Sequence, residues 1–379
     1  MTPEQLGLLA LQVAVIVATA RLAGWIFRRV LGQPAVVGEM VAGVLLGPSL
    51  FGLLAPDLQA ALFTPDTREP LRTLGQLGVG LYMVLVGLAF DRGELRRQAA
   101  GAGAVCLAGM AAPFLAAAAL TPWLIGVPGL FGPGVGPGAA GLFLGACIAI
   151  TAFPVLARIL DERGLSGSPL GALTLSAGAI GDAAAWVVLA LVLATLAGGG
   201  GALGAFDLGL YAVLGGFLLG VAIPRGPAAA RLRRVLEPLT VLLLVPLFFA
   251  VSGLSTRLDL IADPALALPA LAVLFASILA KGGACWAAAR LTGQDNRTAL
   301  GIGVLMNARG LMELVILNIG LRAGLIGPAL FSILVLMAIV TTLMTSPLFE
   351  ALYGRRARAR GELGMLEAEA TPLPHTSRP

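Results

Sequence analysis

The sequence predicts an all-α polytopic membrane protein with about eleven transmembrane helices. Of its 379 residues, 58% are apolar and only 12% are charged, and the mean hydropathy is +0.94. A soluble chain averages about 25% charged residues, so this chain lacks the polar surface to cover a water-facing globule. Apolar runs of membrane-spanning length also recur along the chain between charged or Gly/Pro-rich breaks.

The first apolar run extends from Leu6 to Phe27 and is followed by Arg28 and Arg29. Its length suits a bilayer-spanning helix, and its flanks are the reverse of those of a signal peptide, so we expect it to be retained. The eleven predicted spans are residues 6–27, 35–54, 71–90, 98–122, 139–160, 169–197, 207–223, 238–256, 264–289, 298–322 and 326–352.

Arginine distribution predicts the orientation of these spans. With eleven helices, almost all loop arginines fall on alternate loops or on the C-terminal tail; the exceptions are Arg68, Arg72, Arg257 and Arg322. Positive charge is retained on the cytoplasmic side of a membrane. The N-terminus is therefore expected outside and the C-terminus in the cytoplasm.

The remaining composition excludes several classes of protein. The net charge of +5 reflects arginine-rich loops rather than a nucleic-acid-binding face. Cys106, Cys147 and Cys285 lie in separate apolar runs without metal-ligand spacing, so neither disulfides nor a zinc site are predicted. The tail, residues 353–379, is rich first in Arg and then in Pro and Thr, which predicts disorder.

Four ionisable residues lie in the middle of predicted spans. Asp182 is central in the sixth span and Lys281 lies well inside the ninth, while Arg309 and Glu313 are four residues apart in the tenth and so share one helical face. Each such residue costs at least roughly 2.5 to 3.5 kcal/mol at a helix centre, so it should face a partner or a water-filled cavity. Intramembrane charges of this kind indicate a functional site.

Lys281 is the only lysine in a chain that otherwise uses arginine for every basic residue. A buried lysine can release its proton, whereas a guanidinium stays charged. We therefore consider a titratable role for Lys281, in which it releases a second proton beside Asp182. The alternative is a structural salt bridge.

Two spans carry signals of an interrupted helix. Pro154 removes a backbone hydrogen bond within the fifth span, and the run from Asn307 to Gly310 interrupts the tenth. A single proline often marks only a kink. Two interrupted helices in corresponding places, however, point to the midplane site of a transporter.

An internal repeat in the sequence relates the two interrupted spans to each other. Gly43 to Pro48 in the second span is echoed by Gly216 to Gly220 in the seventh, and Val86 to Leu88 in the third by Ser252 to Leu254 in the eighth. Spans four to six then pair with spans nine to eleven. Each pair crosses the membrane in opposite directions, which predicts an inverted-topology repeat.

Four stretches of the sequence carry a resemblance to a known family. They are Gly38-Glu39-Met40 through Gly52, Thr151 to Leu160, Pro246 to Leu254, and Met306 to Gly320. Together they resemble the monovalent cation:proton antiporter superfamily, in particular its second branch of Kef-type and Nap-type proteins and plant cation/H⁺ exchangers. The resemblance extends over nearly the whole chain.

The resemblance implies a sodium/proton antiporter fold in which two discontinuous helices cross at the ion site. It implies a homodimer in a lipid bilayer, here expected to be the inner membrane of a bacterium. The membrane domain, residues 1–352, would comprise core helices at about 71–197 and 238–322 and dimerisation helices at about 6–54, 207–223 and 326–352.

The resemblance also implies roles for individual residues. Asp182 takes the place of the cation- and proton-binding aspartate, Lys281 that of the core lysine, and Thr151 and Arg309 fall at the two helix breaks. Supporting residues are Pro154, Gly181, Asn307, Arg309, Glu313 and Glu39. Relatives usually have Asp, Asn or Gln where this chain has Gly181. The short passage from 196 to 210 also lacks room for a helix pair that relatives contain.

The resulting prediction is a secondary active transporter, not an enzyme, that exchanges Na⁺ or K⁺ for protons at Asp182 by alternating access. It needs no cofactor. One alternative is a sodium-coupled symporter of an organic anion, which would need more polar groups near the breaks than Thr151, Ser176 and Asn307. Another is a transport-dead membrane sensor or scaffold, for which the costly Asp182 and Lys281 would have no use.

Overall fold

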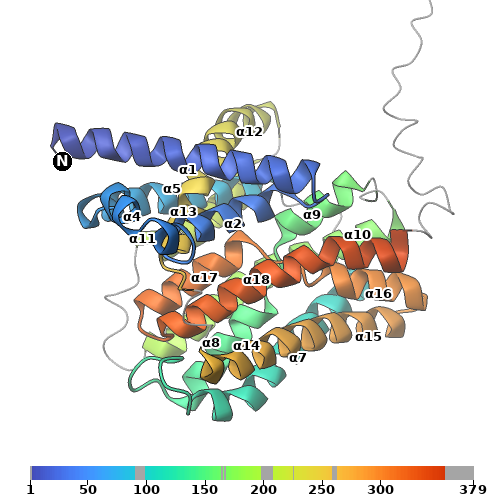
Figure 1. Ribbon diagram of the computed structural model, residues 1–379. Helices are drawn as coiled ribbons and strands as arrows, with labels where there is room; N and C mark the ends of the chain where they lie inside the picture. The colour runs from blue at the N-terminus through green and yellow to red at the C-terminus, as the bar shows by residue number, and fades with distance from the viewer. Residues whose placement is uncertain are drawn as a thin grey trace, which may run out of the picture.

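A computed structural model describes residues 2–89, 99–163, 165, 168–197, 208–224, 226–257 and 263–354. Secondary structure within these ranges is helical, apart from one isolated bridge between Phe131 and Ile326 (Figure 1). The all-α prediction is therefore confirmed. The predicted disordered tail from residue 355 onward lies outside the described residues.

The first half of the chain contains α1 (Pro3–Arg29), α2 (Ala35–Leu46), α3 (Phe51–Leu54), α4 (Pro56–Leu62), α5 (Pro65–Ala89), α7 (Ala99–Leu124), α8 (Pro137–Ala149), α9 (Phe153–Glu162) and α10 (Pro169–Ala197). The second half contains α11 (Leu208–Ala222), α12 (Pro227–Leu239), α13 (Val245–Leu254), α14 (Pro264–Ser277), α15 (Gly283–Leu291), α16 (Asn296–Leu305), α17 (Leu311–Arg322) and α18 (Pro328–Phe349). Three π-helical turns extend or join these helices: η2 (Thr240–Leu244), η4 (Ile278–Gly282) and η5 (Glu350–Gly354).

Each of the eleven predicted spans coincides with a helix or a broken helix. Six of the described helices are long and apolar enough to cross a membrane by themselves: Pro3–Arg29, Ala35–Leu54, Ala100–Leu124, Pro227–Leu254, Pro264–Leu291 and Pro328–Gly354. The chain is therefore an integral membrane protein. The count of eleven crossings stays a prediction.

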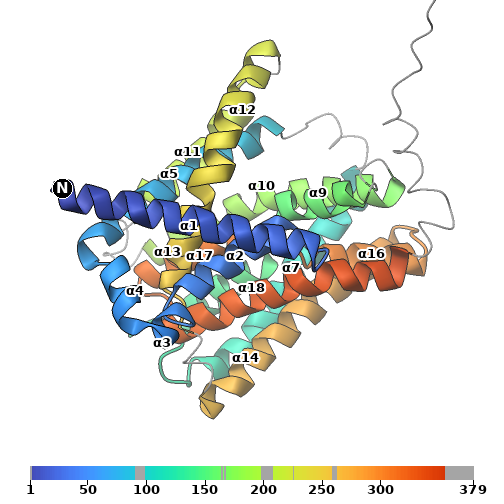
Figure 2. The ribbon, with the colours of Figure 1, turned by 45° about the horizontal axis from the view of Figure 1, so that its top comes forward.

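The helix that contains the eighth predicted span, residues 238–256, begins before that span. A proline within a helix lacks a backbone N–H and clashes with the preceding turn. The structure instead carries the helix through Pro238 from Pro227, with the widened turn η2 immediately after the proline. Figure 2 shows the resulting extension, α12, projecting from the body of the molecule.

The centre of the molecule is formed by α17 and α18. Every residue from Leu311 to Gly320 of α17 is buried, and α18 is buried along most of its length against α14, α16 and α17. The loops at one end of this centre are joined, because Gly327 donates its backbone N–H to Leu130 (2.8 Å) and Gly132 donates to Leu325 (3.2 Å). These contacts fix α8 and α17 relative to each other.

Helices α2 and α13 pack backbone against backbone through glycines. A Cβ atom on Gly43 would lie 2.2 Å from the Phe249 carbonyl oxygen, and one on Gly47 would lie 2.2 Å from that of Gly253. Only a residue without a side chain permits this approach. Small residues at such contacts are typical of helix pairs in membranes, where close packing drives association.

Helices α5 and α11 are also packed backbone against backbone through glycines. A Cβ atom on Gly216 would lie 2.4 Å from the Gly80 carbonyl oxygen, and one on Gly220 would lie 2.2 Å from that of Val84. Gly215, the neighbour of Gly216, has no atom within 4 Å of its Cβ position.

This contrast predicts opposite outcomes for two adjacent substitutions. Gly216→Ala should lower the melting temperature of the detergent-solubilised protein, because forcing a methyl group into a packed contact typically costs about 1 to 3 kcal/mol. Gly215→Ala should leave the melting temperature unchanged or raise it, since alanine is the better helix former. Equal melting temperatures for the two variants would contradict the close α5–α11 contact.

Candidate functional site

Two interrupted helices meet in the interior of the protein. The first interruption separates α8 from α9 at residues 150–152, and the second separates α16 from α17 at residues 306–310. Ala152 donates its backbone N–H to the Ala308 carbonyl (3.0 Å), and the Thr151 hydroxyl donates to the Met306 carbonyl (3.1 Å). The two breaks therefore satisfy part of each other's backbone.

Local sequence accounts for both interruptions. Pro154 is the second residue of α9, a position that tolerates proline because the first N–H groups of a helix have no intrahelical partner. The break lies just before it, as its sequence position predicts. At the second break, a Cβ on Gly310 would lie 2.9 Å from a Val155 methyl carbon and 3.1 Å from Ala152 Cβ, so glycine allows α17 to start against α9.

Arg309 binds the C-terminal end of α8. Its guanidinium donates from Nη1 to the carbonyls of Cys147 (2.8 Å) and Ile150 (3.2 Å), and from Nη2 to that of Ile148 (2.6 Å). The last carbonyls of a helix lack intrahelical partners and carry partial negative charge. A fully buried cation at this position supplies both the hydrogen bonds and the opposite charge.

Lys281 contributes to the same helix end. Its ammonium group donates to the carbonyl of Ala149, the last residue of α8, and to that of Gly109 in α7 at 3.4 Å. Both buried cations thus bind carbonyls around the first break. Neither of these two hydrogen bonds of Lys281 is to Asp182.

Glu313 and Thr342 hold Arg309 from the other side. Glu313 Oε2 lies 3.5 Å from Arg309 Nη1, and neither side chain is exposed to solvent. The Thr342 hydroxyl of α18 accepts from the Arg309 backbone N–H (2.9 Å) and lies 3.0 Å from its carbonyl oxygen. The two side chains are therefore neighbours, as their spacing predicts, but they do not share a helical face, because Arg309 lies in the break before α17.

Asp182 differs from Arg309, Lys281 and Glu313, each of which has at least one hydrogen-bonded or ion-pair partner, although Arg309 Nε and Glu313 Oε1 have none among the described residues. Asp182 lies in α10 with 3% of its surface exposed, and within the described part of the chain neither carboxylate oxygen has a hydrogen-bond partner. Its polar neighbour is the backbone of Phe153, the first residue of α9. The positive end of the α9 dipole therefore faces a carboxylate that is otherwise unsatisfied.

Gly181 and Asn307 complete the surroundings. A Cβ on Gly181 would meet only the Cys106 sulfur, at 3.8 Å, which is an ordinary contact. Asn307 donates from Nδ2 to the Gly303 carbonyl (3.0 Å), while its Oδ1 has no partner among the described residues. Asn307 thus offers a free buried acceptor at the second break.

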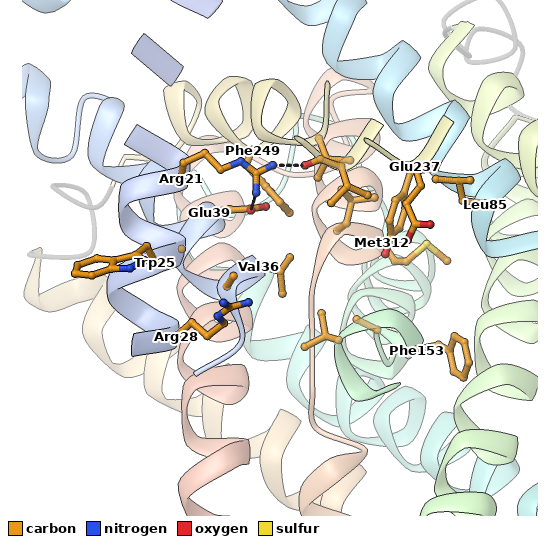
Figure 3. Close-up of a pocket in the computed structure, with 18 of the residues that line it drawn as sticks. Arg21, Trp25, Arg28, Val36, Glu39, Leu85, Phe153, Glu237, Phe249 and Met312 are labelled. Carbon is orange, nitrogen blue, oxygen red and sulfur yellow. Dashed lines mark hydrogen bonds and ion pairs between the residues drawn. The ribbon is translucent and has the colours of Figure 1, made fainter. Parts of the chain in front are cut away.

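A cavity of about 510 Å³ leads to the two breaks from one side of the molecule. Ala152, Phe153, Leu311 and Met312 line its inner part, where α9 and α17 begin. Its wall on the other side comes from α1, α2 and α13 (Figure 3). The charged residues that line it are Arg21, Arg28, Glu39, Arg233 and Glu237.

Glu39 lies in this wall and not at the breaks. It is a buried residue of α2, and Arg21 Nη1 of α1 lies 3.4 Å from its Oε1. Arg21 is not among the residues predicted from the sequence, although it lies within the first apolar span and so carries the same signal as Asp182 and Lys281. Of the other cavity arginines, Arg28 lies in the last turn of α1 and Arg233 lies within α12, and the sequence assigns both to loops between the predicted spans.

Comparison with known proteins identifies the family. The chain matches the family described as sodium/hydrogen exchanger, transmembrane, over residues 17–210 and 200–351. The chain belongs to this family. The resemblance predicted from the four sequence motifs is thereby confirmed.

Individual relatives agree with this membership. A Na⁺/H⁺ antiporter of Synechocystis, NhaS4, is 34% identical over 93% of this chain and 99% of its own length. Cation/H⁺ antiporter 18 of Arabidopsis thaliana is 32% identical over 94% of this chain, and K⁺/H⁺ antiporter 1 of Saccharomyces cerevisiae is 27% identical over 85%. The chain spans 50% and 44% of these last two relatives.

The matches also bear on the predicted missing helix pair. The alignment with NhaS4 covers 411 positions, more than the 379 residues of this chain, so the relative contains residues without a counterpart here. The two family matches meet at residues 200–210, which largely coincide with the short passage between α10 and α11. Residues 198–207 themselves lie outside the described part.

The contact between the breaks predicts a stability effect for Thr151. Thr151→Val removes the hydroxyl that donates to the Met306 carbonyl, and loss of a buried partner costs about 1 to 3 kcal/mol. The matched control is Thr174→Val in α10, whose buried hydroxyl donates only to the Leu170 carbonyl of its own helix. We expect a clearly larger drop in melting temperature for Thr151→Val; equal drops would mean that the hydroxyl does not join the two breaks.

Proposed function

We propose that this protein exchanges a monovalent cation, Na⁺ or K⁺, for protons across a membrane, and that Asp182 binds either the cation or the proton. Its relatives are named Na⁺/H⁺, cation/H⁺ and K⁺/H⁺ antiporters. The observation that carries the assignment to Asp182 is its buried carboxylate: among the described residues neither of its oxygens has a hydrogen-bond partner, whereas Arg309 and Lys281 each donate to carbonyls at the first break.

A buried carboxylate without a partner is unfavourable unless a cation or a proton neutralises it. The two occupants exclude each other because they neutralise the same charge. A protein that presents such a group alternately to the two sides of a membrane exchanges one occupant for the other. This is the minimum chemistry that cation/proton exchange requires.

The neighbouring groups suit a small, weakly held cation. The Thr151 oxygen and the free Oδ1 of Asn307 are neutral oxygen ligands at the two breaks. Arg309 and Lys281 bind the carbonyls at the end of α8, so those carbonyls do not serve as ion ligands in this conformation. We infer that the Arg309 and Lys281 side chains fix the shape of the site and that Asp182 supplies its exchangeable charge.

We further propose an exchange of one proton for one cation. Gly181 supplies no second carboxylate beside Asp182. Lys281 would release a second proton if cation binding broke an Asp182–Lys281 pair, but its hydrogen-bond partners are Ala149 and Gly109. Because neither partner is Asp182, cation binding at Asp182 does not require these bonds to break, and the contacts favour a lysine that keeps its charge throughout the cycle.

The packing of glycine-containing helices supports the inverted repeat. If span two corresponds to span seven and span three to span eight, then the contact of α2 with α13 corresponds to that of α11 with α5. Both pairs are in close glycine contact, through Gly43 and Gly47 in one and Gly216 and Gly220 in the other. We propose that the two halves of the chain are inverted copies that cross at the breaks.

Helix contacts also favour a revised division into two units. We propose a scaffold unit that includes α1, α2, α5, α11 and α13, because α5 packs against α11 and α13. The core unit then includes α7 to α10 and α14 to α18, because α18 packs against α14, α16 and α17. This assigns α5 and α13 to the scaffold and α18 to the core, whereas the sequence predicts the reverse for all three.

Alternating access would follow from movement of the core against the scaffold. The cavity lies between them, with α1 and α2 on one wall and the starts of α9 and α17 on the other. With the N-terminus outside, the end of α1 at Arg28 faces the cytoplasm, and so does the cavity. We infer that this conformation is open to the cytoplasm.

The scaffold suggests how two copies would associate in the bilayer. Helix α1 exposes Leu6, Leu11 and Leu22 along its length. We propose that this apolar surface contacts a second copy and lipid. An organic-anion symporter or an inert scaffold is not favoured by the names of the relatives.

Substitution of Asp182 tests the proposal. Asp182→Asn keeps the shape of the side chain but removes the exchangeable charge, so in proteoliposomes cation-driven proton movement should fall to the level of empty vesicles. The matched control is Asp263→Asn, which makes the same chemical change at an exposed residue before α14. Proton movement is read with an interior pH dye after addition of Na⁺ or K⁺. Full exchange by a folded Asp182→Asn protein would remove Asp182 from the mechanism.

A further inference from the structure

A buried hydrogen bond joins the core unit to the scaffold unit beyond the cavity. Asn318 of α17 donates from Nδ2 to the Ser252 hydroxyl of α13 at 2.9 Å, and both residues are buried. Phe249 of α13 and Met312 of α17 line the cavity (Figure 3). Ser252 follows Phe249 by about one helical turn, and Asn318 follows Met312 by less than two. Both helices run outward in the predicted topology, so this bond lies between the cavity and the outer side.

A second contact between the two units lies farther out on the same helix. Arg322 is four residues after Asn318, so the two side chains share a face of α17. Gln76 of α5 faces Arg322, and with its carboxamide oxygen turned toward the guanidinium it accepts from Nη1 and Nη2 at 2.7 Å each. Glu69 and Arg72, which lie near Arg322, also belong to α5. One face of α17 thus meets two scaffold helices.

The helix that carries these contacts also takes part in the cavity. Helix α17 begins at the second break, and its first residues, Leu311 and Met312, line the cavity. Movement of α17 as a rigid body would therefore change the cavity and the two outer contacts together.

We propose that the face of α17 that carries Asn318 and Arg322 is an outer gate. Its bonds to Ser252 and Gln76 hold the conformation whose cavity is open to the cytoplasm, and they break when the site turns to the opposite side. The inference rests on the proposed cation/proton exchange and on the division into core and scaffold. Asn318 and Ser252 are then positioning residues, which set the equilibrium between two conformations and touch neither cation nor proton.

Polar contacts suit a gate that must open repeatedly. Water that enters the open gate replaces the lost hydrogen bonds, so the net free energy of each bond is small. Asn318 also donates to the Leu314 carbonyl of its own helix at 2.8 Å, and this bond survives when the bond to Ser252 breaks. The two conformations can therefore remain close in free energy, as alternating access requires.

The first test compares the apparent KM for Na⁺ or K⁺ on the two sides of the membrane. Everted vesicles expose the cytoplasmic face, and right-side-out vesicles expose the opposite face. The ratio of the outer KM to the cytoplasmic KM follows the ratio of cytoplasm-open to outward-open protein, because each conformation binds the cation from one side only. Ser252→Ala removes one gate hydrogen bond and should lower this KM ratio about fivefold. Gln76→Leu should shift the ratio in the same direction.

A matched control is Ser277→Ala. Ser277 is a buried serine of α14 whose hydroxyl donates to the Leu274 carbonyl of its own helix at 2.9 Å, so its removal should leave the KM ratio at the wild-type value. If the Ser252–Asn318 bond were merely structural, Ser252→Ala would lower the melting temperature and the maximal rate without changing the ratio.

A reversible cross-link tests whether the gate must open during transport. In a protein that carries both Ser252→Cys and Asn318→Cys, oxidation with copper phenanthroline should join α13 to α17 and stop exchange, and dithiothreitol should restore it. Cross-linking is read as the loss of two maleimide-reactive thiols in the denatured protein. The wild type, whose three cysteines are buried, receives the same treatment as a control.

The inference is overturned if the cross-linked protein continues to exchange, or if Ser252→Ala has the wild-type KM ratio. These outcomes are distinct from failure of the proposed function. If the wild-type protein exchanges neither Na⁺ nor K⁺ for protons, the proposed function fails. If the wild type exchanges a cation and Ser252→Ala keeps its KM ratio, only the gate fails.

Discussion

Unsatisfied backbone at two helix breaks is the constraint on which this structure depends. Inside a membrane no water is available to pair with free carbonyl and amide groups, so an interrupted helix must find partners within the protein. Here the two breaks bind each other through Ala152 and Ala308, and Arg309 and Lys281 bind the carbonyls at the end of α8. The position of α17 at the buried centre of the molecule follows from these contacts.

The hydrogen bonds made at the two breaks determine which polar groups remain available for transport. The side chains of Arg309 and Lys281 bind the carbonyls at the end of α8. In the described structure, neither carboxylate oxygen of Asp182 has a hydrogen-bond partner. In the proposed function a cation or a proton neutralises this charge, and the cavity extends to Phe153, whose backbone neighbours Asp182. In the proposed mechanism the carbonyls at the end of α8 therefore do not bind the cargo in this conformation, and the two breaks hold a rigid frame beside the carboxylate of Asp182, to which we assign that role.

Sequence predicts those features that depend on local pattern. Apolar length predicts the spans, Pro154 and the run from Asn307 to Gly310 predict the two breaks, and intramembrane charge directs attention to Asp182 and Lys281. The partners of those charges depend on tertiary packing, and so neither the binding of Lys281 to Ala149 nor the pairing of Glu39 with Arg21 follows from spacing. The helix that contains the eighth predicted span also begins before that span, at Pro227, because it continues through Pro238.

The central claim is that cation and proton compete for one carboxylate, and proton release on cation binding tests it most directly. The purified wild-type protein in weakly buffered detergent solution is titrated with Na⁺ or K⁺, while bound cation is measured by calorimetry and released protons by a pH indicator. Competition at Asp182 alone predicts that, where the unbound site holds its proton, each bound cation releases one proton, and that lower pH weakens cation binding. Cation binding that releases no proton across the pH range would contradict the account, and release of two protons would restore Lys281 as a second carrier.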